Sequence, residues 1–424
     1  MNLIVARQSV WRSIPIQLIG MVTVITVPLI LRVAIPGVIG PDEAYNLLIT
    51  TLASFFAVLM VFFIDRGIVR YPGVEIGSSV VAFVSLAYGL VLAFFVLGRI
   101  EYNRFTLLAS YFLSITWFLW SSYRGQRRSD LLIGVIPPYG DINIHNLPGI
   151  VLRTLPSPDA PVNDLDAVTL DLRLDFDDLW DRRIADLALA GVPVYHIKHL
   201  QESLTGRVEL EHLSETSYGT LSPPIAYVAF RRIADRIVAL LMLILLLPLF
   251  PIIWAIIKMD GPGPVIFRQC RIGYRGEPFT VFKFRTMKHR SAEEQSAMRT
   301  EAMTRSNDSR ITRVGHFLRK TRIDELPQIV NILRGEMSWI GPRPEAEVLS
   351  SWYEKEIPFY RYRHIVYPGI TGWAQVNQGH VAEVVDVKDK LYYDFYYIKH
   401  LSPWIDLLIV GRTIRTMITG AGAK

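Results

Sequence analysis

Long apolar runs dominate the first 125 residues of the chain. They lie at about 14–35, 46–64, 77–98 and 105–122, and each is almost free of charged residues. A helix needs about 20 apolar residues to cross the hydrocarbon of a bilayer. Because the runs have this length and lack the polar face of a helix on a soluble protein, they predict four membrane-spanning helices in residues 1–124 and not a soluble bundle.

Arginines flank the four runs unequally. One side has Arg7, Arg12, Arg66, Arg70, Arg124, Arg127 and Arg128, and the other has Arg32, Arg99 and Arg104. Basic residues gather on the cytoplasmic side of membrane proteins. We therefore expect both ends of the four-helix unit in the cytoplasm, so that everything after residue 124 begins there.

Composition agrees with a membrane class, since 51% of the 424 residues are hydrophobic. The formal net charge of +6 suits anionic lipid or phosphorylated substrates as well as nucleic acid. Nucleic-acid binding is the weaker interpretation, because the arginines fall inside motifs and not in a solvated stripe. The single cysteine, Cys270, excludes an internal disulfide and a multi-thiol zinc site, and we expect it to be a partly buried spectator.

Residues 125–225 change to short apolar runs separated by polar stretches. The runs are "LLIGVIP", "AVTLDL", "VPVYHI" and "VELEHL", and the stretch "DFDDLWDRRIADLALAG" reads as an amphipathic helix that stops at a glycine. This alternation predicts a small α/β (Rossmann-like) cytoplasmic module. Since the turn "GVIPPYGD" has no G-x-G-x-x-G, a structural or assembly role, for example in a homodimer, is favoured over nucleotide binding.

A fifth apolar run, in residues 226–258, contains Pro248 and Pro251 near its middle. Proline removes a backbone hydrogen bond and bends a helix. The run is either a kinked crossing or a helix that enters one leaflet, turns back and leaves on the same side. Basic residues flank both ends, and a crossing would export the rest of the chain, so a re-entrant helix broken at Pro248 is favoured.

The last segment, 259–424, is rich in arginine and in glycine and proline turns, and we predict a mixed, mainly α-helical catalytic domain. Its stretch "RIDELPQ" places Asp324 beside Glu325, two residues before Pro327. The pair could simply complement a helix dipole. Alternatively, a helix that opens here would let both carboxylates serve one pocket, with one attacking phosphorus and the other holding Mg2+ among nearby cations.

Several long motifs occur in order across residues 228–418: "KFRTM", "LRKTRIDELPQ", "GEMSWIGPRPE" and "YPGITGWAQVN". With them the segment resembles the bacterial sugar transferase family, the polyprenyl-phosphate hexose-1-phosphate transferases. The four preceding helices and the α/β module resemble the large, polytopic branch of that family. The resemblance implies an enzyme of the bacterial inner (cytoplasmic) membrane that transfers hexose-1-phosphate from a UDP-sugar to undecaprenyl phosphate and releases UMP.

The resemblance also implies roles for individual residues. Asp324 would be the nucleophile that forms a phosphosugar intermediate, and Glu325 a Mg2+ ligand. Phosphate contacts or shaping of the site would fall to Lys283, Arg285, Arg319 and Arg343, and Pro248 would break the re-entrant helix. The chain departs from the family at Leu247, where some members have serine, and at "QGH" after "AQVN", where His380 is more simply a solvated loop residue than a catalytic one.

The sequence is also compatible with other functions. The same transfer could proceed by direct attack of undecaprenyl phosphate, without a covalent intermediate. The chain could also be a membrane scaffold or regulator of polysaccharide assembly. A transporter is disfavoured, because the four runs have no charges at their centres. For the sugar, we expect glucose or galactose, in an exopolysaccharide, capsule or O-antigen pathway.

Overall fold

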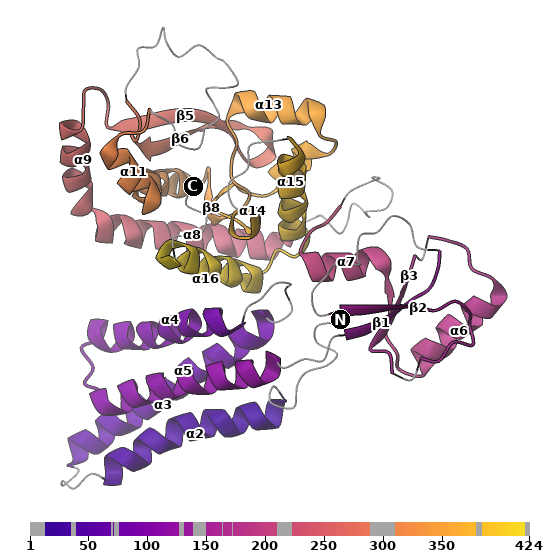
Figure 1. The fold of residues 1–424 in the computed structure, drawn as a ribbon. Coiled ribbons are helices and arrows are strands. Elements are labelled where there is room, and N and C mark those ends of the chain that lie inside the picture. The colour runs from indigo at the N-terminus through magenta and orange to yellow at the C-terminus, as the bar shows by residue number, and fades with distance from the viewer. Residues whose placement is uncertain are drawn as a thin grey trace. The chain divides into compact units, whose positions relative to one another are not determined.

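The structure is a computed structural model. It describes residues 13–34, 40–68, 71, 76–126, 131–138, 150–162, 164–171, 173–209, 223–288, 310–378 and 384–419. The chain divides into two compact units, Met1–Gly206 and Arg207–Lys424 (Figure 1). His380 and the linker around residue 215 lie outside the described residues.

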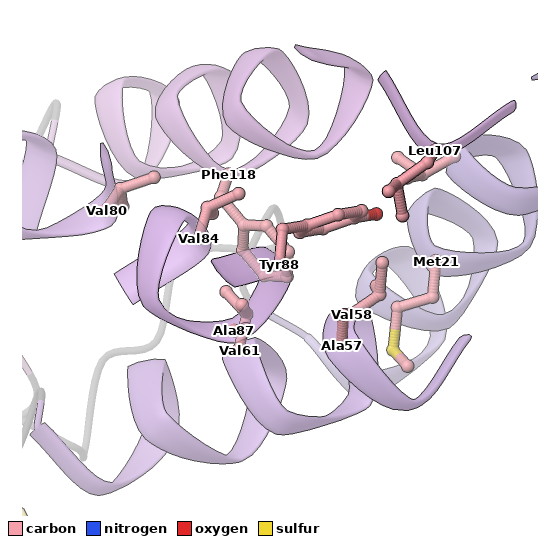
Figure 2. Close-up of a cluster of buried hydrophobic side chains, with 11 residues drawn as sticks. Met21, Ala57, Val58, Val61, Val80, Val84, Ala87, Tyr88, Leu107 and Phe118 are labelled. Carbon is pink, nitrogen blue, oxygen red and sulfur yellow. The ribbon is translucent and has the colours of Figure 1, made fainter. Parts of the chain in front are cut away.

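Four long apolar helices form the first part of the chain, as the sequence predicts. They are α2 (Ile14–Ala34), α3 (Pro41–Ile68), α4 (Ile76–Leu97) and α5 (Arg104–Gln126), and each is long and apolar enough to cross a membrane. Small and branched side chains such as Val58, Val84 and Ala87 fill their shared interior (Figure 2). Some of the polar side chains there are paired, for example Gln17, which donates to Ser121 over 3.1 Å. Such pairing stabilises polar groups in a low-dielectric interior.

The α/β module contains a four-stranded, all-parallel sheet. Its strands are β1 (Leu131–Val135), β2 (Ile150–Thr154), β3 (Ala167–Leu170) and β4 (Val194–His196), in the order β2-β1-β3-β4. Strands β1, β3 and β4 coincide with predicted apolar runs, whereas β2 was missed. Its sequence "IVLRT" carries an arginine and lies at the sheet edge, so its apolar signal is short.

Two helices cover opposite faces of that sheet. Helix α6 (Asp178–Leu189) lies within the stretch predicted to be helical, begins at the N-cap Asp177 and is followed by Gly191 with φ of +80°. Its Leu187 packs with Val168 and Leu170, while α7 (Ile197–Thr205) packs its own apolar residues on the other face of β1 and β3.

The fifth apolar run forms two helices, α8 (Ile225–Leu246) and α9 (Leu249–Met259), which meet at an angle of 65°. The break falls on Leu247 and Pro248, where the sequence places it. Leu241 and Leu245 on α8 and Trp254 on α9 are more than half exposed. Both arms therefore present apolar surface.

The remaining chain is mainly helical, as predicted. An antiparallel hairpin, β5 (Ile266–Ile272) and β6 (Pro278–Phe284), is followed by helices and by a parallel pair, β7 (Ser338–Ile340) and β8 (Gly369–Thr371). The other elements are α11 (Arg313–Lys320), the 3-10 helices Ile323–Gln328 (η5) and Tyr360–Ile365 (η6), α12 (Ile329–Arg334), α13 (Glu347–Glu356), α14 (Trp373–Gln378), α15 (Val384–Lys399) and α16 (Pro403–Thr419).

Two further features concern Cys270 and helix α16. Cys270 on β5 is exposed, and the expectation that it is partly buried was wrong. Helix α16 has one face packed into its own domain, where Leu408 is fully buried and Asp406 accepts hydrogen bonds from Tyr227 and Tyr397.

Candidate active site

Asp324 and Glu325 lie on η5, which directly precedes α12. The sequence suggests an α-helix that opens at the carboxylates, but the turn is a 3-10 helix. Arg322, before it, has φ of +58°, a left-handed conformation that starts a new turn instead of extending α11. Both carboxylates are buried, with 8% and 5% of the residue exposed, so they share one enclosed site.

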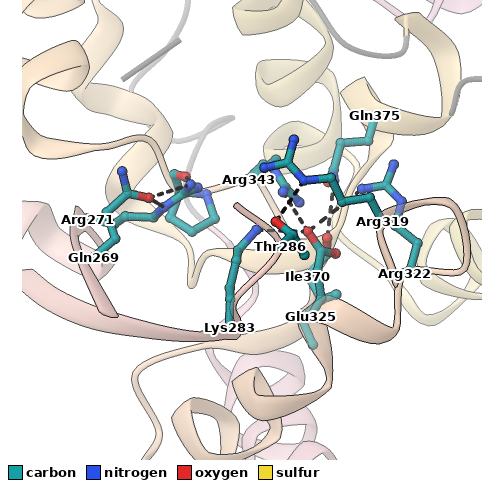
Figure 3. A network of polar contacts seen from close by, with 11 residues as sticks. Gln269, Arg271, Lys283, Thr286, Arg319, Arg322, Glu325, Arg343, Ile370 and Gln375 are labelled. Atoms are coloured by element: carbon teal, nitrogen blue, oxygen red, sulfur yellow. Dashed lines mark hydrogen bonds and ion pairs between the residues drawn. The ribbon is translucent and has the colours of Figure 1, made fainter. Parts of the chain in front are cut away.

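Glu325 is surrounded by cations. Its Oε1 lies 3.0 Å from the Lys283 Nζ and 2.6 Å from the Arg343 Nη2, and the Arg322 guanidinium is 3.8 Å away (Figure 3). Burial alone would raise the pKa of Glu325, but Arg343, Lys283 and Arg322 together hold that pKa well below its usual range. These cations therefore favour the ionised form of Glu325.

Asp324 has the opposite environment. Its Oδ1 is buried and accepts no hydrogen bond from any residue that the structure describes. Burial, followed by the negative charge of Glu325, raises the pKa of Asp324 above its ordinary value, while Lys283, Arg343 and Arg319 partly offset this. The two neighbouring carboxylates thus differ: one is held ionised by cations, and the other has a buried oxygen available to a reaction partner.

Lys283 and Arg343 reach the pair from different elements. Lys283 is on β6, and burial lowers its pKa to about 8, although Glu325 opposes that change. Arg343 follows β7, which pairs with β8. This pairing is close: a Cβ on Gly341 would lie 2.3 Å from the Tyr367 carbonyl oxygen. The glycines at this junction bring the Arg343 segment near the carboxylates.

Arg319 and Arg285, also assigned to phosphate by resemblance, lie in different settings. Arg319 on α11 donates through Nε to the Thr286 hydroxyl over 2.9 Å, beside the carboxylate pair (Figure 3). Arg285 instead donates to three main-chain carbonyls at the C-terminal end of α9 and just beyond it, those of Ile257, Gly261 and Pro262, at 2.6 to 2.9 Å. These contacts hold the turn between α9 and β5. A contact of Arg285 with phosphate stays a prediction.

Arg322, one of the nearby cations that the sequence offers for the carboxylate pair, contacts Glu325. The structure adds two residues that sequence reasoning did not assign to the site: Arg271 on β5 and the buried Arg363 on η6 contact the segment that carries Arg343. Their signal in the sequence is weak, because they are two arginines among 45 Lys and Arg residues. Gln375 in "GWAQVN" donates to the Ile370 carbonyl over 3.1 Å.

Comparison with known proteins identifies the family. Residues 226–420 match the family model described as bacterial sugar transferase. Over 376 residues, 88% of this chain and 87% of the relative, the chain is 42% identical to the UDP-N-acetylgalactosamine-undecaprenyl-phosphate N-acetylgalactosaminephosphotransferase of Aeromonas hydrophila. The chain belongs to the bacterial sugar transferase family. The N-terminal helices and the match across most of the chain place this sugar transferase in the large, polytopic branch.

Two further relatives of this sugar transferase are named for glucose. The UDP-glucose:undecaprenyl-phosphate glucose-1-phosphate transferases of Xanthomonas campestris pv. campestris and Escherichia coli are 45% and 43% identical over 186 residues. The matched region is 43% of this chain in each case and 38% and 39% of the relatives. These two relatives therefore match less than half of this sugar transferase, and the sugar in their names differs from the sugar in the name of the Aeromonas hydrophila relative.

The carboxylate pair of this sugar transferase could give a magnesium ion only one or two protein ligands. The described residues contain no group of three or more His, Cys, Asp or Glu that could hold a metal. Mg2+ bound to diphosphate substrates commonly takes one or two carboxylate oxygens from the protein. Asp324 Oδ1 is a buried, unpaired oxygen of this kind, whereas Glu325 Oε1 is occupied by Lys283 and Arg343. A metal contact by Glu325 would use its other oxygen.

Proposed function

We propose that the protein transfers a sugar-1-phosphate from a UDP-sugar to undecaprenyl phosphate and releases UMP. The observation that carries this proposal is the asymmetry between two adjacent buried carboxylates. Glu325 is ion-paired to Lys283 and Arg343, while Asp324 Oδ1 has no partner among the described residues. A carboxylate that is buried, unpaired and surrounded by cations can attack a phosphorus atom whose oxygens those cations neutralise.

In the proposed first step, Asp324 attacks the phosphorus that bears the sugar. A bond forms between the Asp324 oxygen and phosphorus, and the bond from phosphorus to the oxygen bridging the two phosphates breaks. The electron pair of that bond leaves with UMP. An oxygen of undecaprenyl phosphate then attacks the same phosphorus, the bond to Asp324 breaks, and the carboxylate is restored.

Positioning and charge neutralisation carry most of this reaction, since one phosphate linkage replaces another. Lys283, Arg343 and Arg319 supply positive charge around the pair. Glu325 keeps Lys283 and Arg343 in place through its short contacts to both. Bound Mg2+, held by the carboxylates and the diphosphate, would withdraw charge from the leaving phosphate.

We further propose that α8 and α9 form a re-entrant membrane helix. The 65° bend at Leu247 and Pro248 and the exposed apolar side chains on both arms support it, and so do the basic residues at both ends of the run. Both flanks then lie in the cytoplasm, and the carboxylate pair lies at the inner face of the cytoplasmic membrane. A cytoplasmic UDP-sugar and a lipid phosphate can meet there.

The donor sugar is the finer part of the proposal. The relative matched over 88% of the chain is named for N-acetylgalactosamine, whereas the relatives named for glucose match over 43%. We therefore rank UDP-N-acetylgalactosamine ahead of the expected UDP-glucose and UDP-galactose. The experiment is UMP release by the purified protein with undecaprenyl phosphate and each of the three donors. No UMP from any donor would favour the scaffold alternative.

For the α/β module we propose an assembly role. Its parallel order β2-β1-β3-β4, with one helix on each face, supports the Rossmann-like assignment. A homodimer through this module remains our proposal. Native mass measurement of a mild membrane extract tests it, and a monomer would contradict it.

A further inference from the structure

The segment 342–345, which carries Arg343, is held by its carbonyl groups. Pro342 and Pro344 have no N–H and donate no main-chain hydrogen bond, so the carbonyl groups of the segment make most of its main-chain contacts. Its four successive carbonyls accept hydrogen bonds from four separate groups: Pro342 from the Gly369 N–H at 3.0 Å, Arg343 from the Arg363 Nη2 at 2.9 Å, Pro344 from the Arg271 Nη1, and Glu345 from the Ile272 N–H at 3.2 Å.

Arg363 is fixed on its own account. Only 3% of it is exposed, and the same guanidinium donates to the Tyr360 hydroxyl over 2.6 Å and to Asp394 over 2.9 Å. The planar guanidinium can therefore serve Asp394, Tyr360 and the Arg343 carbonyl at once. A lysine ammonium at this position cannot span the three acceptors.

Arg271 holds the opposite side of the segment. From β5 it donates to the Pro344 carbonyl, and its Nε and Nη2 donate to Gln269 at 3.1 and 2.9 Å. Burial, together with the nearby charge of Arg343, lowers the pKa of Arg271 to about 10. A third tether joins the Glu345 side chain to Lys390.

We propose that Arg271 and Arg363 are positioning residues that hold the main chain of 342–345 so that the Arg343 guanidinium reaches Glu325. They act through Arg343 and touch neither carboxylate of the pair. This inference rests on the proposed function, because it explains how the cation that pairs with Glu325 is placed. The competing explanation is that the two arginines merely stabilise the domain.

A double-mutant cycle separates positioning from general stabilisation. The variants are Arg363→Lys, Arg343→Lys and both together, with kcat for UMP release normalised to the folded fraction. Positioning through Arg343 predicts that Arg363→Lys lowers kcat by about tenfold to a hundredfold, and by less than about threefold once Arg343 is already lysine. Equal losses in the two backgrounds would overturn the proposal. The same cycle with Arg271→Lys tests the other side.

Exposed arginines on the same elements provide matched controls. Arg361 on η6, whose side chain is 79% exposed, and Arg268 on β5 should change kcat by less than about twofold as lysine variants. A loss at these positions equal to that of Arg363→Lys would also overturn the proposal.

Hydrogen exchange gives a readout that does not depend on turnover. The Gly369 and Ile272 amides donate to Pro342 and Glu345, so Arg363→Lys should speed their exchange at least about tenfold while distant core amides keep theirs. Unchanged exchange at both amides would contradict the proposal that Arg363 holds the main chain of 342–345. If the wild type released no UMP while exchange rose as expected, the proposed function would be wrong and the structural role of the two arginines would stand.

Discussion

Arg343 donates a 2.6 Å hydrogen bond to Glu325, although the two residues are 18 positions apart in the chain, with α12 and β7 between them. This contact joins the "GPRPE" and "RIDELPQ" motifs at one buried point. The negative charge of Glu325 raises the pKa of Arg343. In turn, the positive charge of Arg343 helps to hold the pKa of Glu325 well below its usual range. The neighbouring Asp324 is then the carboxylate whose buried oxygen is left for chemistry.

Glu325→Gln should impair both stability and turnover. The substitution leaves the buried Lys283 and Arg343 without their anionic partner, and losing one member of a buried ion pair costs about 3–5 kcal/mol. We expect a lower midpoint of thermal unfolding and a loss of UMP release with a weaker dependence on Mg2+. A matched control is Glu354→Gln, whose partner Arg361 is exposed and which should change stability by less than about 1 kcal/mol. Equal effects of the two variants would contradict the account.

The pH dependence of kcat/KM should be bell-shaped. Burial and Glu325 raise the pKa of Asp324, so activity is expected to rise as pH increases through that raised value and the nucleophile ionises. Burial lowers the pKa of Lys283 to about 8, so activity should fall as pH rises through about 8 and this cation is lost. Lys283→Arg, whose guanidinium stays charged, should move the alkaline limb upward. An alkaline limb that stays near pH 8 in this variant would rule out Lys283 as its source.

Gly315→Ala should displace α11 from the end of β6. A Cβ at this position would lie 2.0 Å from the Thr286 carbonyl oxygen, so main chain must move. Overpacking of this kind costs about 1–3 kcal/mol, and the shift would also disturb the contact between Arg319 and Thr286. Thermal unfolding and UMP release measure the two effects. Gly89→Ala, where a Cβ meets nothing within 4 Å, is the control and should be neutral. A neutral Gly315→Ala would contradict the packing described.

Pro248→Leu should favour one straight helix over the bent pair α8 and α9. Proline ends α8 here, and leucine restores the missing N–H and removes the steric cause of the break. Labelling of cysteines placed beyond each flank, in cells, should show one flank moved to the outer side. Accessibility of both flanks from the cytoplasm, unchanged by the substitution, would show that the bend does not depend on Pro248.

Much of the architecture could be predicted from periodicity. The four membrane helices, α6 and the break at Pro248 follow from long apolar runs, a capped amphipathic pattern and a proline. Strand β2 could not be predicted, because a short edge strand with an arginine carries little periodic signal. The 3-10 geometry at Asp324 depends on the positive φ of Arg322, a residue type that gives no sequence cue for that conformation.

The sequence predicted which residues form the candidate site better than how they are arranged. Asp324, Glu325, Lys283 and Arg343, which the motifs suggested, lie beside one another in the structure, and their roles stay predictions. Arg343 reaches Glu325 from the segment after β7, which pairs with β8, and Lys283 reaches it from β6. These are contacts between distant segments that spacing along the chain does not encode. The holding roles of Arg271 and Arg363 depend on the same long-range packing.

The most direct test of the central claim is a single-turnover reaction in the absence of acceptor. The protein is mixed with a UDP-sugar labelled in the phosphate next to the sugar, quenched, digested and analysed by mass spectrometry. The account predicts one equivalent of UMP or less and a phosphosugar adduct on Asp324, absent from Asp324→Asn. No adduct and no UMP without undecaprenyl phosphate, from a protein that turns over when the lipid is added, would contradict it and favour direct attack.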